Sequence, residues 1–297
     1  GEAFTYSKLL ARYIKKYSPG TIVIAGGYHA TLYEEDILRY SNFDLSVAGN
    51  GEEPLKTLIE IVQSDYKYGI STDEFLNNLA YKQATDPIQG LIFRNNGQIV
   101  FNSRDVGRKI LTTVPRYPLD SGKTKIHMLL ESSGCPWNAC NFCVHNKFVP
   151  VYHTRKPSEI IYEIREMIKQ GIGLFRFAGS DTPPHYGQQI AKAILEADLR
   201  IEFTMGCRAV KNCSKPEIFQ NTRDAFALLM QAGLRGIFMG GETGNDTINY
   251  EVMNKGINSE DVVNTIKAFR QAQDSTNQKA TVSLAFIYPS PTVESIT

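Results

Sequence analysis

Three of the five cysteines in this 297-residue chain lie close together, in the segment Cys135-Pro-Trp-Asn-Ala-Cys140-Asn-Phe-Cys143. Thiolates are soft ligands that suit iron–sulfur clusters, zinc or Cu(I). A single loop can wrap three of them around one centre, whereas cysteines scattered through a core cannot converge in this way. An iron–sulfur cluster held by only three protein thiolates leaves one iron open to another ligand. The spacing therefore favours a reactive metal centre over a purely structural one.

The main alternative for these cysteines is a structural zinc site, with His145, Cys207 or Cys213 as the fourth ligand. Zinc sites usually show two separated pairs of ligands, so the grouping of three favours the cluster. Cys207 and Cys213 are expected to pack as small hydrophobic side chains. If zinc is the metal, the chain is a zinc-stabilised α/β binding protein without catalysis.

The composition describes a globular chain with no obvious macromolecular partner. It is 42% hydrophobic, which supplies the core of one large or two medium domains. Lys+Arg number 32 against 31 Asp+Glu, a net charge of +1, so no global field favours nucleic acid or an anionic membrane. No apolar run approaches the roughly 20 residues of a membrane helix, and no secretory signal opens the chain. An odd, clustered set of cysteines predicts metal binding in a reducing compartment, and therefore a cytoplasmic location.

The first third has the pattern of half of a doubly wound α/β unit. Helices and short strands alternate there, over residues 4–17, 21–25, 34–40, 44–48 and 54–63. Residues 64–86 are polar with weak periodicity, which indicates a short helix or an insertion. Residues 91–94 and 98–101 are predicted to pair as a hairpin, because the Asn96-Gly97 between them tolerates the positive φ of a tight turn. The chain begins inside a predicted helix and without Met, so we expect a fragment of a longer protein.

Beyond residue 125, strands and helices alternate at a period of about 30 residues. Strands are expected over residues 126–132, 173–178, 201–206, 235–240 and 281–287. Helices are expected over residues 157–169, 185–197, 222–232 and 260–272. This rhythm predicts a parallel sheet with crossover helices, either an open sheet or part of a barrel. Every chemically capable group follows a strand, where such folds carry their sites: residues 135–143, 179–181, 207–208, 241–242 and 288–291.

These residues resemble the radical S-adenosylmethionine (SAM) superfamily, and more narrowly its group with a cobalamin-binding domain ahead of the radical domain. Cys135, Cys140 and Cys143 match the family's three ligands to a 4Fe-4S cluster, and Phe142 matches its aromatic residue before the last cysteine. The segment Met239-Gly-Gly-Glu-Thr-Gly244, followed by Met253-Asn-Lys-Gly256, is similar to the family's G-x-E-[ST]-G and M-x-K-G.

Weaker likenesses and two departures accompany these motifs. Ala25-Gly-Gly-Tyr-His-Ala-Thr31 and Gly49-Asn-Gly-Glu52 resemble turns of the family's cobalamin-type domain. Phe286-Ile-Tyr-Pro-Ser-Pro-Thr-Val-Glu294 resembles a degraded F-I-x-G-x-P-G-E-T segment. The common cysteine spacing is C-x-x-x-C-x-x-C, so this loop has one extra residue and must bulge. The cobalamin signature D-x-H-x-x-G is absent from the sequence.

The resemblance implies an enzyme that cleaves SAM reductively with a 4Fe-4S cluster, with cobalamin as an associated cofactor, for radical methylation or rearrangement of an unknown substrate. That substrate is a small molecule or peptide, and the electron donor is a protein such as flavodoxin or ferredoxin. Glu242, after Gly241, would accept hydrogen bonds from the SAM amine or ribose. Arg208 would pair with the SAM carboxylate, because its fork geometry suits a planar acid.

The resemblance also implies roles for two further pairs. Ser180 and Asp181 match a polar pair that the family places after its second barrel strand. Gly26 and Gly27 would let the backbone approach the cobalamin tail, because neither has a Cβ. Simpler roles stay open for several of these residues: helix capping for Glu242 and Asp181, a surface ion pair for Arg208, and a local hydrogen bond for His29 rather than cobalt ligation. No catalytic residue is assigned.

The predicted fold class is α/β, with a partial Rossmann-like cobalamin-binding-type domain followed by a partial radical SAM (β/α) barrel. The first domain is expected over residues 1–90, a hairpin and linker over 91–124, and the barrel over 125–297. One more interpretation stays open, in which the barrel keeps its cluster but the Rossmann-like half no longer binds cobalamin.

Overall fold

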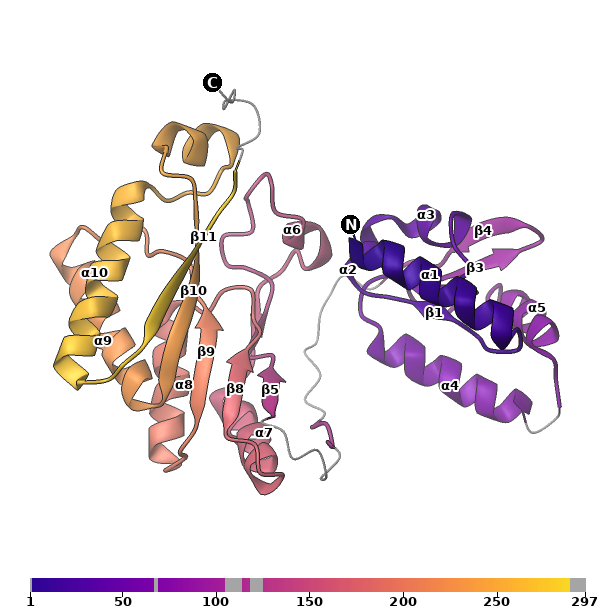
Figure 1. The fold of residues 1–297 in the computed structure, drawn as a ribbon, viewed down its shortest axis with the longest axis horizontal. Coiled ribbons are helices and arrows are strands. Elements are labelled where there is room, and N and C mark those ends of the chain that lie inside the picture. Colours follow the sequence, from indigo (N-terminus) through magenta and orange to yellow (C-terminus); the bar gives the residue numbers. More distant parts are fainter. Residues whose placement is uncertain (1, 67–68, 105–113, 118–124, 289–297) are drawn as a thin grey trace. The chain divides into compact units, whose positions relative to one another are not determined.

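The computed structural model describes residues 2–66, 69–104, 114–117 and 125–288. The chain divides into two compact units, Gly1–Arg108 and Lys109–Thr297 (Figure 1). Each unit has its own sheet and its own core.

The first unit is built around a four-stranded sheet with the order β1-β2-β3-β4. Its elements, in chain order, are α1 (Glu2–Tyr17), β1 (Ile24–Ala25), α2 (Tyr28–Leu32), α3 (Glu34–Arg39), β2 (Leu45–Val47), α4 (Glu52–Tyr66), α5 (Thr72–Lys82), β3 (Leu91–Asn95) and β4 (Gln98–Phe101). β1 and β2 are parallel, whereas β3 runs antiparallel to both of its neighbours. The predicted hairpin is confirmed, with Asn96 at φ 49° and Gly97 at φ 79° in its turn.

The first unit differs from the sequence expectation in two places. β1 covers only the end of the run predicted over residues 21–25 because the N–H of Val23 donates to the side chain of Asp44, at 2.7 Å, instead of to a strand. The hairpin, which the sequence grouped with the linker, extends the sheet through the pairing of Ser46 with Ile92. Alternate residues of β3 enter two different core clusters, so this sheet is covered on both faces.

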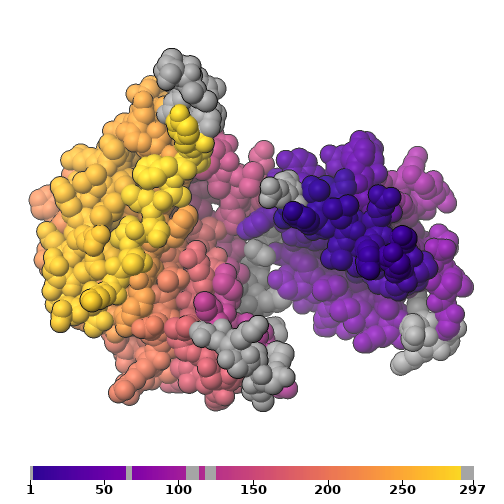
Figure 2. Space-filling view, viewed as in Figure 1, coloured from indigo at the N-terminus to yellow at the C-terminus, as the bar shows by residue number. Residues whose placement is uncertain are grey.

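The apolar face of α1 is not covered within this unit. Leu9, Leu10 and Tyr13 are each more than half exposed, and Figure 2 shows the helix (indigo) at the surface. By contrast, Ala11 is buried, so the helix contacts its own unit through a narrower side.

The second unit has a five-stranded, all-parallel sheet with the order β11-β10-β9-β8-β5. Its strands are β5 (Ile126–Leu129), β8 (Leu174–Phe177), β9 (Glu202–Gly206), β10 (Leu234–Glu242) and β11 (Thr281–Phe286). The crossover helices are α7 (Pro157–Lys169), α8 (Pro184–Glu196), α9 (Pro216–Gln231) and α10 (Ser259–Thr276). Shorter elements lie in the loops: β6 (Ser132–Ser133), α6 (His145–Phe148), β7 (His153–Thr154) and the π-helix η1 (Ile248–Val252). The alternation predicted beyond residue 125 is confirmed.

Proline sets the start of three crossover helices. Pro157, Pro184 and Pro216 occupy the first turns of α7, α8 and α9, where a missing N–H costs no hydrogen bond and φ is already helical. α9 therefore begins at Pro216, earlier than the predicted start at residue 222.

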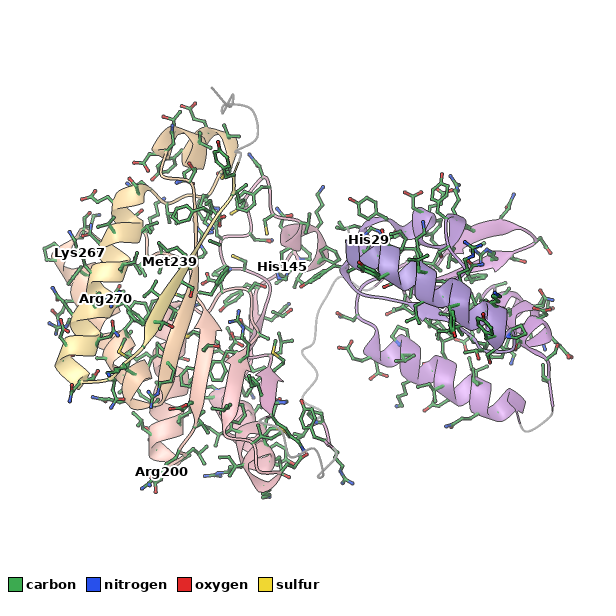
Figure 3. The ribbon with its side chains drawn as sticks, viewed as in Figure 1. His29, His145, Arg200, Met239, Lys267 and Arg270 are labelled. Atoms are coloured by element: carbon green, nitrogen blue, oxygen red, sulfur yellow. The ribbon has the colours of Figure 1, made fainter. Side chains whose placement is uncertain are left out.

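The two faces of the second sheet have different environments. The crossover helices cover one face (Figure 1), and Phe175, Phe177 and Met239 are buried against them. Figure 3 labels Met239 between β10 and the helical layer. The prediction that Phe175 and Phe177 are core residues is confirmed. The alternate residues, such as Met128 and Phe238, are exposed on the other face.

A buried polar network joins β5 to α7. Glu163 accepts a hydrogen bond from His127, with 2.7 Å between Oε1 and Nε2, and it also pairs with Arg155. The other ring nitrogen of His127 lies 2.9 Å from the hydroxyl of Tyr117. Burial by itself raises the pKa of Glu163, but the hydrogen bonds from His127 and Arg155 outweigh it, and the net effect holds the pKa below its usual value near 4.5.

We expect this network to make stability depend on acid pH. A carboxyl whose pKa is lower in the folded than in the unfolded state stabilises the fold above its unfolded pKa, and this contribution is lost as pH falls through the folded pKa. The free energy of unfolding, measured in urea, should therefore fall more steeply below about pH 4.5 in the wild type than in Glu163→Gln. Parallel pH profiles for the two proteins would contradict this prediction.

Candidate functional site

The candidate site lies in the loops at the carboxyl ends of the parallel strands of the second unit. The cysteine loop, residues 135–143, follows β5 and β6 and carries the thiols of Cys135, Cys140 and Cys143, all in the reduced form. Cys140 is buried and the other two are half-buried. Other loops at the same edge carry Asp181 after β8 and Arg208 after β9.

The extra residue of this loop is accommodated by a left-handed backbone at Asn138, with φ 47°. Asn adopts this conformation more readily than most residues, because its short side chain can bond locally. Here the side-chain amide donates to the carbonyl of Pro150 at 2.7 Å. The bulge that the spacing requires is therefore built into the loop.

Four hydrogen bonds fix the cysteine loop to the turn at residues 252–254, and we call this set the latch. Trp137 Nε1 donates to the carbonyl of Asn254 at 2.8 Å, and the Asn254 amide donates back to the carbonyl of Ala139 at 2.8 Å. The backbone N–H of Asn141 donates to Met253 at 3.0 Å, and its side chain donates to Val252 at 2.9 Å. The latch explains why the M-x-K-G segment lies beside the cysteines, a contact that the sequence did not predict.

Gly256 lies beside the latch, and its lack of a side chain leaves room for the indole ring of Trp137. A Cβ at residue 256 would lie 2.2 Å from Cζ2 of Trp137, and the residue has φ 71°. Contacts below about 3 Å force a movement of one partner. Both the ring contact and the backbone conformation therefore require glycine.

We expect Gly256→Ala to destabilise the second unit by about 2–4 kcal/mol, from overpacking and from strain at positive φ. Trp137→Leu in the same background should recover part of this loss, because it removes the ring that the new methyl group meets. Gly244→Ala is the matched control, since a Cβ there meets nothing within 4 Å. Urea denaturation measures all of these variants. Equal losses at residues 244 and 256 would show that the ring contact has no energetic effect.

Two cations flank the cysteine loop. Arg208 places Nη1 3.8 Å from Sγ of Cys140 and donates from Nη2 to the carbonyl of Lys255 at 2.6 Å. Its guanidinium also lies over the Trp137 ring, 5.3 Å from the centroid. Lys255 has its Nζ 5.8 Å from the ring centroid of Phe142. Burial raises the pKa of the Cys140 thiol, and the charges of Arg208 and Lys255 oppose that rise.

Glu242 is positioned by an irregularity at the end of β10. The register with β11 shifts between Gly240 and Glu242, and Glu242 has φ 56°. A bulge of this kind re-aims the side chain that follows it, and a Cβ at Gly241 would come within 3.0 Å of the Phe286 ring. The buried carboxylate of Glu242 forms an ion pair with Lys255. Glu242 does not cap a helix, because η1 begins after Thr247.

The polar pair after β8 separates into two environments. Asp181 is buried, its Oδ1 accepts the backbone N–H of Arg208 at 2.9 Å, and desolvation raises its pKa. It does not cap α8, whose N-cap is Pro183. Ser180 is exposed and hydrogen-bonded to His145. Arg208 has no ion pair with an acidic side chain among the described residues; it binds a carbonyl, the Cys140 thiol and a ring instead.

Glu131, which is fully buried shortly before the cysteine loop, was not predicted from the sequence. Its carboxyl group accepts hydrogen bonds from Thr182 Oγ1 at 2.6 Å and from the N–H of Gly179 at 3.0 Å. Burial raises the pKa of Glu131, and these hydrogen bonds oppose that rise. Glu131 therefore ties the loop after β8 to the start of the cysteine loop. An acidic residue at the end of an apolar strand was the signal that could have revealed it.

The donor set suits a thiolate-bound metal centre, although the thiols do not converge in this structure. In the described part of the chain, no three Cys, His, Asp or Glu side chains are gathered closely enough to hold a metal ion. The three thiols nevertheless share one anchored loop beside two cations, which suits a cluster of thiolate ligands. Cys207 and Cys213 are buried, as expected of small hydrophobic side chains, and Cys207 belongs to the main core cluster.

The glycines of the first unit lie at the start of α2. Gly27 has φ 84° and a Cβ there would meet nothing within 4 Å, whereas a Cβ on Gly26 would lie 3.9 Å from the carbonyl of Val47. The ring of His29 lies 4.0 Å from that of Phe4 and 4.7 Å from that of Tyr33, measured between centroids. His29 is thus held by aromatic neighbours in its own unit.

Comparisons with known proteins agree on one family. The sequence model described as "Radical SAM superfamily" matches residues 132–296. Two curated relatives are both named anaerobic magnesium-protoporphyrin IX monomethyl ester cyclase. The relative from Cereibacter sphaeroides is 25% identical over 174 residues, 55% of this chain and 26% of its own length. The relative from Rubrivivax gelatinosus is 22% identical over 241 residues, 77% of this chain and 40% of its own length.

Solved structures extend this likeness to nearly the whole fold. The cobalamin-dependent SAM radical enzyme OxsB with aqua-cobalamin bound has a TM-score of 0.66 at 17% identity, covering 96% of this chain and 39% of that one. The methyltransferase TsrM from Kitasatospora setae, with cobalamin and a [4Fe-4S] cluster bound, has a TM-score of 0.67 at 16% identity, covering 95% and 54%. The predicted α/β fold class is confirmed. The chain spans less than half the length of the curated relatives it matches. None of the described helices is long and apolar enough to cross a membrane.

Proposed function

Because the chain belongs to the radical SAM superfamily of enzymes, we propose that it binds a 4Fe-4S cluster through Cys135, Cys140 and Cys143 and cleaves SAM reductively, for radical methylation or rearrangement of a substrate. The observation that carries this proposal is the anchored cysteine loop with two cations at the carboxyl edge of a parallel sheet. When bound, the cluster supplies the electron that breaks the sulfonium C–S bond of SAM. The protein contributes position, charge and exclusion of water.

Arg208 and Lys255 supply the positive charge in this proposal. A cation near a thiol favours the thiolate, which is the form that binds metal. The bond from Arg208 to the carbonyl of Lys255 fixes the guanidinium beside Cys140. Its remaining N–H groups suit the carboxylate of SAM, because the guanidinium fork matches a planar acid.

Glu242 supplies the negative charge for the amine of SAM. Lys255 pairs with Oε1 of Glu242, so Oε2 is the oxygen we assign to the SAM ammonium or ribose. Gly241 lets the backbone pass close to the Phe286 ring. Phe142, on the cysteine loop, would contact the bound nucleoside. Ser180 and Asp181 would face the same ligand from the end of β8, with Asp181 holding the backbone of Arg208 in place.

The first unit is proposed to carry cobalamin. Both solved neighbours are described as cobalamin-bound, and their likeness covers nearly all of this chain. Gly26 and Gly27 would allow the cobalamin tail to approach the backbone at the start of α2. The curated relatives are named for a tetrapyrrole ester, which suggests a small, largely apolar substrate. The electron donor would be a protein such as flavodoxin or ferredoxin in the cytoplasm.

Anaerobic reconstitution with iron and sulfide, followed by incubation with SAM and dithionite, tests this function. The product to quantify is 5′-deoxyadenosine, with Cys140→Ala treated identically as the control. We expect the wild type to take up about four irons, to show the broad visible absorbance of an iron–sulfur cluster, and to form 5′-deoxyadenosine that the variant does not form. Retention of a corrinoid after gel filtration tests the first unit separately.

Two results would contradict the proposal. Stoichiometric zinc with no uptake of iron would leave a zinc-stabilised binding protein. A cluster that forms without any SAM binding, measured by calorimetry, would contradict the assigned roles of Arg208 and Glu242. A cluster with SAM cleavage but no corrinoid retention would restrict the function to the barrel alone.

A further inference from the structure

The backbone turn that carries Glu242 is strained. The N–H of Thr243 donates to the carbonyl of Gly241 at 2.8 Å, so a three-residue turn is centred on Glu242. Glu242 has φ 56°, and a turn of this hand is rare and strained for a residue with a side chain. Such a backbone persists only where its surroundings hold it, and it is most common at functional sites. The contacts that hold this turn therefore matter to any ligand that Glu242 binds.

Asn249 holds the far end of this turn. Its Nδ2 donates to the carbonyl of Thr243 at 3.0 Å. Its own carbonyl accepts the backbone N–H of Lys255 at 2.8 Å, and the side chain of Lys255 forms the ion pair with Glu242. Asn249 is thus bonded to the residue that follows Glu242 and to the backbone of the lysine that pairs with it.

The π-helix η1 supplies Asn249 to this position. The N–H of Met253 donates to the carbonyl of Ile248, five residues earlier, at 2.9 Å. A π-helical turn is wider than an α-helical one, and such turns are rare and occur frequently at functional sites. Asn249 is only 1% exposed. Its side chain therefore lies inside the second unit and not on the outer surface of the helix.

The fold uses only half of the amide of Asn249. Nδ2 has its partner, whereas Oδ1 is buried and has no hydrogen-bond partner among the described residues. Burying an oxygen without a partner costs free energy, and a leucine of similar size would not carry that cost. Packing alone therefore does not favour asparagine at this position. The property that leucine would lack is the bond to the turn.

We propose that Asn249 is a positioning residue of the SAM site: its bond to Thr243 fixes the strained turn and so sets the direction in which Glu242 presents its carboxylate to SAM. The inference rests on the proposed function, and it adds a residue that the sequence pattern did not indicate. Neither a contact with SAM nor a chemical step is assigned to Asn249, which acts through Glu242.

Binding of SAM to the reconstituted protein, measured by calorimetry, tests this role. Asn249→Leu removes the donor and keeps a side chain of similar size. We expect its Kd for SAM to rise about tenfold, because the charged hydrogen bond from SAM to Glu242 is weakened. Its iron content and melting temperature should stay close to those of the wild type, because the variant loses an unpartnered buried oxygen together with the hydrogen bond.

A double-mutant cycle separates an effect through Glu242 from a general one. Glu242→Gln should weaken SAM binding about tenfold to a hundredfold. The double variant Asn249→Leu/Glu242→Gln should bind SAM as Glu242→Gln does, because Asn249 acts only through that carboxylate. Losses that add in the double variant would overturn the proposal. Circular dichroism first checks that Glu242→Gln is folded; if it is not, the comparison with a control variant decides alone.

Gln273→Leu is this matched control, since Gln273 makes the same kind of bond from α10. Its side-chain amide donates to the carbonyl of Ala280 at 2.7 Å, and its Oε1 is also buried without a partner in the described part of the chain. This variant should bind SAM as the wild type does. Equal SAM affinity in the wild type and Asn249→Leu, or an equal loss in Gln273→Leu and Asn249→Leu, would overturn the proposal.

The two proposals fail in different ways. A wild type that takes up iron and binds SAM, with Asn249→Leu binding SAM equally well, would refute the positioning role alone. A wild type that takes up no iron, or binds no SAM, would refute the proposed function and this inference with it.

Discussion

Replacing Cys135, Cys140 or Cys143 by alanine is expected to reduce iron uptake to background, whereas Cys207→Ala and Cys213→Ala should take up iron as the wild type does. The first three thiols share one anchored loop, and the other two are buried in other segments of the chain. A cluster that loses one of three thiolate ligands lacks the ligand set that holds it. Iron and sulfide content after anaerobic reconstitution and desalting measure the difference.

Cys207→Ala and Cys213→Ala are matched controls, because all five variants remove one thiol group. Cys207→Ala and Cys213→Ala shrink a buried side chain and cost some stability, so the folded fraction of each variant is measured by circular dichroism first. If Cys207→Ala is fully folded but takes up less iron than the wild type, Cys207 would be a cluster ligand outside the cysteine loop. Iron uptake by Cys140→Ala equal to that of the wild type would remove the basis of the proposed function.

Lys255→Met is expected to destabilise the second unit by about 3–5 kcal/mol, because it leaves the carboxylate of Glu242 buried without its partner. Both side chains of this ion pair are nearly buried, with 7% exposure for Lys255 and 10% for Glu242. The double variant Glu242→Gln/Lys255→Met should lose less than Lys255→Met alone, since no unpaired charge remains. Urea denaturation of the wild type, Lys255→Met, Glu242→Gln and the double variant gives the coupling energy between the two side chains.

Lys267→Met is the control for loss of a lysine in this unit, since Lys267 lies exposed on α10 (Figure 3). It should change the free energy of unfolding by less than about 0.5 kcal/mol. A double variant as unstable as the sum of its singles would show that the pair is not coupled. That result would also remove the reason for assigning one oxygen of Glu242 to Lys255 and the other to SAM.

Much of the second unit could be predicted from the sequence because its signals are local. The alternation of short apolar runs with amphipathic helices, and the Pro residues at helix starts, are properties of short windows. The hairpin at Asn96-Gly97 is equally local. The cysteine loop was recognisable because three cysteines fell within one short segment. By contrast, the predicted start of α9 at residue 222 was too late, because the helix begins at Pro216 and none of its first six residues is buried.

The contacts that shape the site could not be predicted, because they join segments far apart in the chain. Asn141 and Asn254 are ordinary loop residues until the fold brings their loops together. The pairing of Lys255 with Glu242 depends on the bulge at the end of β10. Glu131 is a buried residue between β5 and β6, and its partners Thr182 and Gly179 come from the loop after β8. The sequence pattern does not show that these residues lie close together.

The latch has a consequence for the order in which the protein matures. Its two halves are separated by 111 to 117 residues of sequence, so a chain emerging from the ribosome presents all three thiols well before Asn254 and Gly256 exist. Until then the cysteine loop lacks the four hydrogen bonds of the latch, and closing so long a loop carries an entropic cost. We therefore expect metal loading to follow synthesis of the turn after β10, with the vulnerable thiols exposed to oxidation during that interval.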